Sequence, residues 1–120
     1  MKIKTAELTG VALDWVVAKC EGVSQQQWAW YRRTCAEEEV PENRPHCYAF
    51  STQWSAGGPV IERERIELST TNASPEAWRA NGFDYMERCA VRGSTPLIAA
   101  MRCFVASRFG DEVDIPEELA

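Results

Sequence analysis

The sequence predicts an α+β fold, in which a small antiparallel sheet of three or four strands packs against two main helices, one N-terminal and one C-terminal. Apolar residues recur at helical spacing near the start of the chain and again after residue 95. Between these segments, short runs that alternate apolar and polar residues are separated by turn-forming residues. A chain of 120 residues can build one hydrophobic core, so we expect residues 1–120 to form a single domain.

The first helix is expected from about residue 10 to residue 21. Thr9 is a suitable N-cap residue, and Gly22 suits the position just after the helix. The apolar residues of this segment recur on one helical face, namely Leu13, Val16, Val17 and Cys20. This face should pack against the C-terminal helix.

The segment QQQWAWYRRTCAEEE, residues 25–39, is compatible with a helix or with a strand followed by an exposed acidic turn. Its aromatic residues alternate with period 2, as in a strand, whereas Gln, Ala, Arg and Glu favour a helix. Pro41 and Pro45 then indicate a loop, after which we expect a short strand from Cys47 to Ser51.

The stretch from residue 57 onward contains the remaining turns and strands. Gly57 and Gly58 predict a tight turn, with Pro59 at the first position of a short helix. Residues 66–70 alternate apolar and polar side chains, as a half-buried strand does. Two further strands are expected, at residues 77–80 and 88–91.

The C-terminal helix is the expected centre of the core. Ser94 or Thr95 suits its N-cap and Pro96 its first turn, and Gly110 follows its end. Apolar or small residues cover most of its circumference, so other elements must cover more than one side of it. Most of the core should come from Leu13, Val16, Val17, Trp54, Ile61, Ile66, Leu68, Trp78, Leu97, Met101, Phe104 and Val105. From about residue 111 we expect a short, acidic, extended tail.

The composition is typical of a soluble globular protein, with 45% hydrophobic residues, 26% charged residues and a formal net charge of −5. No apolar run is long enough to cross a membrane. No apolar stretch follows the first basic residues, so we expect no secretory signal and a cytoplasmic protein. The negative charge opposes binding to nucleic acid, which is disfavoured as a partner unless a local basic surface overrides the net charge.

No residue pattern indicates catalysis, a cofactor or a metal. The five cysteines are odd in number, and in a reducing cytoplasm we expect free thiols. They lack the close pairs of a structural zinc site, and His46 beside Cys47 does not form a thiol dyad by adjacency alone. The Gly57-Gly58-Pro59 stretch lacks the lysine and hydroxyl of a P-loop. We therefore expect no enzymatic activity, no catalytic residue, no cofactor and no metal.

Three blocks are distinctive in their order and spacing: LTGVALDWVVAKCEG (8–22), YAFSTQWSAGGPVIERERIEL (48–68) and TPLIAAMRCFVASRFGDEVDIPEEL (95–119). Together they resemble the NinX-like family of small phage and prophage proteins. The resemblance does not extend to residues 23–45 or to the stretch NGFDYMERCAV, residues 81–91. It implies a phage or prophage protein of unknown function acting in a bacterial cytoplasm, and it transfers no activity and no catalytic residue to this chain.

Protein binding is the favoured function. Trp, Tyr and Arg concentrate at interface hot spots, and here they gather ahead of an acidic triplet. The candidate partner surface comprises Trp28, Trp30, Tyr31, Arg32, Arg33, Glu37, Glu38 and Glu39. We expect a non-enzymatic phage or prophage accessory protein that binds a host or phage protein, or a second copy of itself. The acidic triplet and tail would suit a basic partner surface by steering its approach.

Association with nucleic acid is the alternative function. The expected order of a helix, three strands and a helix is that of a double-stranded-RNA-binding domain. Arginine and tryptophan residues would supply a local basic and aromatic surface. The net charge opposes this alternative, and the order of elements is only an analogy.

Overall fold

The computed structural model describes residues 1–37, 48–72, 75–82 and 91–119, with side chains up to residue 33 in the first range. In chain order the described elements are β1 (Lys2–Lys4), the 3₁₀ turn η1 (Thr5–Glu7), α1 (Gly10–Cys20), α2 (Gln25–Glu37), α3 (Trp54–Glu64), β2 (Glu67–Thr70), β3 (Trp78–Asn81), β4 (Val91–Gly93), α4 (Pro96–Phe109), β5 (Glu112–Asp114) and η2 (Glu117–Leu119). Four helices and two small antiparallel sheets in these ranges confirm the α+β class.

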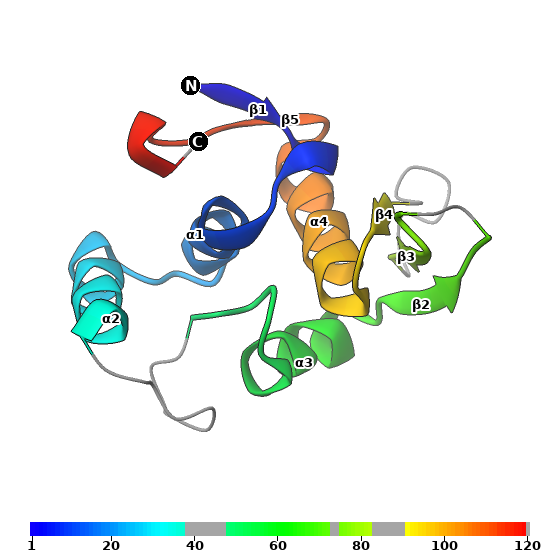
Figure 1. The fold of residues 1–120 in the computed structure, drawn as a ribbon, viewed down its shortest axis with the longest axis horizontal. Coiled ribbons are helices and arrows are strands. Elements are labelled where there is room, and N and C mark those ends of the chain that lie inside the picture. Colours follow the sequence, from blue (N-terminus) through cyan, green and yellow to red (C-terminus); the bar gives the residue numbers. More distant parts are fainter. Residues whose placement is uncertain (38–47, 73–74, 83–90, 120) are drawn as a thin grey trace.

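Helix α4 lies at the centre, with α1 on one side of it and the strands β2 to β4 on the other (Figure 1). Its N-cap residue Thr95 accepts a hydrogen bond of 3.1 Å at Oγ1 from the backbone N–H of Ile98. Buried residues surround the helix: Leu97, Ala99, Ala100, Met101, Arg102, Cys103, Phe104 and Val105. The expected N-terminal and C-terminal helices are confirmed, and so is the central place of the second.

Strands β2, β3 and β4 form an antiparallel sheet of three strands. Leu68 lies opposite Ala80, and Ala80 lies opposite Val91. The strands expected at residues 66–70 and 77–80 are confirmed. The strand expected at residues 88–91 is observed from Val91 to Gly93, while residues 88–90 lie outside the described ranges.

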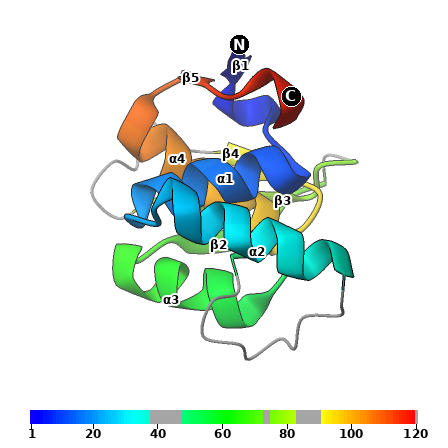
Figure 2. The ribbon, with the colours of Figure 1, turned by 90° about the vertical axis from the view of Figure 1, so that its left-hand side faces the viewer.

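The acidic C-terminal segment is not an extended arm, which corrects the prediction. Strand β5 pairs antiparallel with β1, with Val113 opposite Ile3. The backbone N–H of Ile115 donates a hydrogen bond of 2.9 Å to the carbonyl of Met1. Val113 and Ile115 are buried, so apolar contact holds this segment against the domain. The two ends of the chain consequently lie together (Figures 1 and 2).

The predicted Gly-Gly turn is wrong, because α3 begins at Trp54 and contains Gly57, Gly58 and Pro59 in its interior. Gly57 allows α3 to pack closely on its neighbours. A Cβ at Gly57 would lie 2.5 Å from the carbonyl oxygen of Phe50 and 2.6 Å from Cδ2 of Leu97. The glycine is therefore required by tertiary packing.

The segment before α3 is a turn where a strand was expected, so that prediction is wrong for residues 48–51. The carbonyl of Ala49 accepts hydrogen bonds from the backbone N–H groups of Thr52 and Gln53, at 3.2 and 2.9 Å. Cys47, the first residue of the expected strand, lies outside the described residues. The turn places the buried Tyr48 ring beside Trp28 of α2, and the buried Phe50 ring stacks on Tyr48.

Most of the predicted core is confirmed by burial, namely Leu13, Val16, Val17, Ile66, Leu97, Met101, Phe104 and Val105. Three more predicted core residues are half-buried: Ile61, Leu68 and Trp78. Trp54 is an error, since its exposed fraction is 50%. Helix α3 packs through Gly57 and Val60, whereas Trp54 is the first residue of the helix and lies at its exposed end.

Candidate functional site

Helix α2 lies at the outside of the molecule and resolves the helix-or-strand alternative in favour of a helix (Figure 2). Trp28 and Tyr31 lie on its inner face, with exposed fractions of 9% and 7%. Their ring centres are 5.5 Å apart, and the Tyr48 ring lies 5.1 Å from that of Tyr31. These aromatic contacts attach α2 to the domain.

The structure divides the predicted partner surface. Trp28 and Tyr31 are buried and so belong to the core, whereas Trp30, Arg32 and Arg33 are exposed. The Glu37 side chain and all of Glu38 and Glu39 lie outside the described part of the chain. The described candidate surface is thereby reduced to one tryptophan and two arginines.

Four exposed residues form what we call the outer ridge of α2: Gln26, Ala29, Trp30 and Arg33. Their spacing of i, i+3, i+4 and i+7 puts them on one side of the helix, opposite the buried aromatic residues. The exposed fraction of Trp30 is 44%. Beside the ridge is a shallow hollow of about 340 Å³, lined by Gln26, Gln27, Trp30 and Tyr48.

Two capping motifs fix the elbow between α1 and α2. At the end of α1 the N–H groups of Gly22 and Val23 donate to the carbonyls of Lys19 and Ala18, at 3.2 and 3.0 Å. Gly22 has a φ of 81°, which confirms its predicted place after the helix. Ser24 then caps α2 reciprocally with Gln27: Ser24 N–H donates to Gln27 Oε1 at 2.9 Å, and Gln27 N–H donates to Ser24 Oγ at 3.1 Å.

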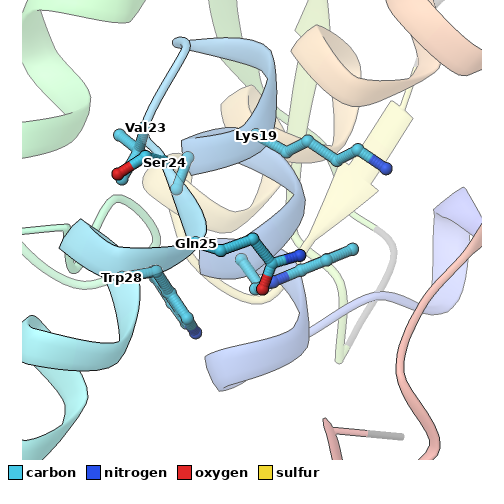
Figure 3. Close-up of a pocket in the computed structure, with 7 residues that line it drawn as sticks. Lys19, Val23, Ser24, Gln25 and Trp28 are labelled. Atoms are coloured by element: carbon cyan, nitrogen blue, oxygen red, sulfur yellow. The ribbon is translucent and has the colours of Figure 1, made fainter.

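A second hollow, of about 260 Å³, lies at this elbow. It is lined by Trp15, Ala18, Lys19, Val23, Ser24, Gln25 and Trp28 (Figure 3). The Nζ atom of Lys19 lies 5.2 Å from the centre of the Trp15 ring. The lining of this elbow hollow therefore combines two indoles, an amide and a cation.

A buried carboxyl group connects α1 to the turn before α3. Asp14 is 8% exposed, and its Oδ1 accepts a hydrogen bond of 2.8 Å from the backbone N–H of Ser51. Burial raises the pKa of Asp14 to about 6, although hydrogen bonding to Ser51 and the charge of Arg32 act in the opposite direction. No local sequence pattern indicates this contact, because Asp14 and Ser51 are 37 positions apart in the chain.

Arg102 is a buried structural side chain. Its Nε donates to the carbonyl of Leu8 at 2.7 Å, and its Nη1 donates to Glu76 Oε1 and to the carbonyl of Arg92, both at 2.9 Å. These bonds join α4 to the segment before α1 and to β4. Its donors are engaged within the fold, so we assign it to stability.

The described cysteines are poor nucleophiles. Burial raises the pKa of the Cys20 thiol to about 11, and Cys103 is fully buried. Among the residues that the structure describes, no three His, Cys, Asp or Glu side chains are grouped to hold a metal ion. His46, Cys47, Cys89 and the Cys35 side chain lie outside that part of the chain.

Two exposed arginines lie side by side on the outer face of the sheet. Arg79 in β3 is directly opposite Arg92 in β4. Like charges in this arrangement repel each other, so the pair destabilises the sheet slightly unless an anion binds there.

None of the helices in the described ranges is both long and apolar enough to span a membrane.

Comparison with protein-family models assigns most of this chain to one family. No curated protein matches the chain. The family model described as Bacteriophage P22, NinX matches residues 4–108. This range contains the first two distinctive blocks, most of the third, and also residues 23–45, where the resemblance had not been recognised. The match covers most of the sequence, and the chain therefore belongs to the NinX family of phage proteins.

Proposed function

We propose that this phage accessory protein is a non-enzymatic interaction module of the bacterial cytoplasm, which binds a host or phage protein through the outer ridge of α2. The observation that carries the proposal is the exposure of Trp30, 44%, next to Arg33 and a shallow hollow. Tryptophan and arginine are the residue types most enriched at the hot spots of protein interfaces.

The inner face of α2 supports this proposal. Trp28 and Tyr31 pack against Tyr48, so they hold the helix while Trp30 faces outward. A helix presented in this way loses little conformational entropy when a partner binds. Residues at i, i+3, i+4 and i+7 are also those that an amphipathic helix uses in a partner groove.

A non-enzymatic function fits the chemistry of the described residues. Asp14 is buried and bound to Ser51, and the Cys20 thiol is protonated at neutral pH. Neither group combines exposure with an activating neighbour, which general acid–base or nucleophilic catalysis requires.

The test is an affinity capture from host lysate, treated with nuclease, using tagged wild type, Trp30→Ala and Trp54→Ala. Trp54 is a matched control, because it is also an exposed tryptophan, at 50%. We expect a protein captured by wild type and Trp54→Ala and lost with Trp30→Ala, and binding reproduced with the two purified proteins. Equal capture by all three would contradict the proposal. Light scattering of the wild type alone tests whether a second copy is the partner.

Nucleic acid is the second candidate, favoured by the adjacent Arg79 and Arg92. These two guanidinium groups could contact phosphates from the outer face of the sheet. Labelled single- and double-stranded DNA and RNA should then bind at low salt, and Arg79→Glu should weaken binding. The absence of any mobility shift at low salt would exclude this candidate.

A further inference from the structure

The elbow hollow has the chemistry of a second contact site, on the side of α2 next to the outer ridge. We propose that it binds an acidic segment of the partner protein, with one large apolar side chain in the hollow and flanking carboxylates at Lys19 and Arg32. This inference rests on the proposed function and specifies the partner segment.

The size and walls of the hollow fit a single side chain. Its volume of about 260 Å³ is below the range of about 300–1,000 Å³ typical of small-molecule pockets. Trp15 of α1 and Trp28 of α2 both line it, so two different helices contribute indole rings. Aromatic walls favour an aromatic or aliphatic side chain, because such contacts bury large apolar areas.

Two cations lie in or beside the hollow: Lys19 lines it, and Arg32 follows Trp28 on the side of α2 that lines it. Lys19 is exposed and held beside the Trp15 ring. Arg32 is exposed and lies one turn beyond Trp28 on the same side of α2. Among the described residues, no carboxylate oxygen lies within 4.0 Å of a side-chain nitrogen of Lys19 or Arg32, so neither cation forms an ion pair there.

Three carboxylates of the described residues near these cations have other partners. Glu21 forms an ion pair of 3.0 Å with Arg63, and Asp114 forms one of 3.0 Å with the N-terminal ammonium. Asp14 is buried and accepts the Ser51 N–H, and the charge of Arg32 acts on it without an ion-pair contact. Among the described residues, Lys19 and Arg32 therefore keep positive charge beside the hollow of a protein whose net charge is −5, and this complements an acidic segment.

The elbow is also preformed. The capping bonds at Gly22, Val23 and Ser24 fix the turn between α1 and α2 without a ligand. A site of this kind needs no rearrangement to accept an extended segment, which favours affinity.

The experiment is a selection of random displayed dodecapeptides on wild type, Lys19→Glu and Arg79→Glu. The last is the charge-matched control, because Arg79 is exposed on β3. We expect enriched peptides with acidic residues around one aromatic or aliphatic residue. Their affinity should fall at least about tenfold for Lys19→Glu and remain within about twofold for Arg79→Glu. In NMR spectra the indole N–H signals of Trp15 and Trp28 should shift.

Each other outcome overturns the inference. One such outcome is that no peptide is enriched, and another is that the enriched peptides are basic or uncharged. The inference also fails if Lys19→Glu leaves peptide binding intact, or if this variant weakens only the binding of DNA or RNA. Trp30→Ala separates this inference from the proposed function. If Trp30→Ala abolishes capture of the partner while Lys19→Glu retains it, only the proposed elbow site is contradicted. If Lys19→Glu abolishes peptide binding while Trp30→Ala leaves the lysate capture unchanged, only the proposed partner contact at the outer ridge is contradicted.

Discussion

Helices α4 and α2 are nearly equal in length, at 14 and 13 residues, but differ in how they are held. Buried residues surround α4, which lies between α1 and the three-stranded sheet. Up to Arg33, helix α2 is attached by the buried Trp28 and Tyr31, and the other residues of this part of the helix are exposed. The comparison teaches that the fold depends on α4, whereas α2 keeps side chains available for a partner.

The same difference explains where charge is tolerated. Arg102 is buried in α4 because backbone carbonyls and Glu76 accept from its guanidinium. Arg32 and Arg33 of α2 remain exposed. Substitutions in α4 should therefore lower the free energy of unfolding, and substitutions on the exposed sides of α2 should alter binding.

The largest effect is expected for truncation of the α4 core. Phe104→Ala and Met101→Ala each remove a fully buried side chain. Each should lower the free energy of unfolding by roughly 2–5 kcal/mol, through lost apolar burial and a residual cavity. Urea denaturation measures the change. Midpoints equal to that of the wild type would show that α4 is not the centre of the core.

Asp14 lies at the boundary between the two regions, and its effect should depend on pH. Its pKa rises from 3.8 to about 6 in the folded protein, so folding favours the protonated acid. Protonated Asp14 therefore contributes to the free energy of unfolding. This contribution is complete below pH 3.8 and is lost as the pH rises through about 6. The loss amounts to about 3 kcal/mol.

Asp14→Asn keeps an oxygen acceptor for Ser51 N–H and cannot ionise. Relative to this variant, the wild type should lose stability between pH 4 and pH 7, as measured by urea denaturation at each pH. A constant difference across this range would show that Asp14 does not titrate there. Asp14→Leu removes the acceptor and should destabilise at every pH, because Ser51 N–H is left buried without a partner.

A smaller effect is expected where α3 meets α4. Gly57→Ala would place a methyl group against the Phe50 carbonyl and the Leu97 side chain, costing about 1–3 kcal/mol. Gly58→Ala is the matched control, because apart from its chain neighbours and the adjacent helix backbone nothing lies within 4 Å of its added Cβ. Its gain in helix propensity is opposed by crowding with Pro59, so its change should be below about 1 kcal/mol. Similar melting temperatures for both variants would contradict the close approach at Gly57.

The parts of the fold that were predictable are those set by local signals. The termini of α1 and α4 follow from cap residues such as Thr95 and Gly22, and their apolar spacing is helical. Segment 25–37 was ambiguous, because Trp28 and Trp30 alternate as in a strand yet also fall on nearly opposite sides of a helix.

Long-range contacts explain the errors. The pairing of β1 with β5 joins residues at opposite ends of the chain, such as Lys2 and Asp114. The role of Gly57 depends on Phe50 and Leu97, which no local pattern connects to it. For the elbow, the Ser24-x-x-Gln27 capping box was readable in the sequence, whereas the hollow between Trp15 and Trp28 arises only when two helices pack.

The smallest effect on stability is expected on the outer ridge. Trp30→Ala should lower the free energy of unfolding by about 1 kcal/mol or less, because 44% of the residue is exposed and it is not part of the buried core. Trp28→Ala, two residues away on the inner face, should cost about 3 kcal/mol. Denaturation of both variants in parallel measures the difference. Equal losses would show that Trp30 supports the fold, and the reason for assigning it to a partner would then disappear.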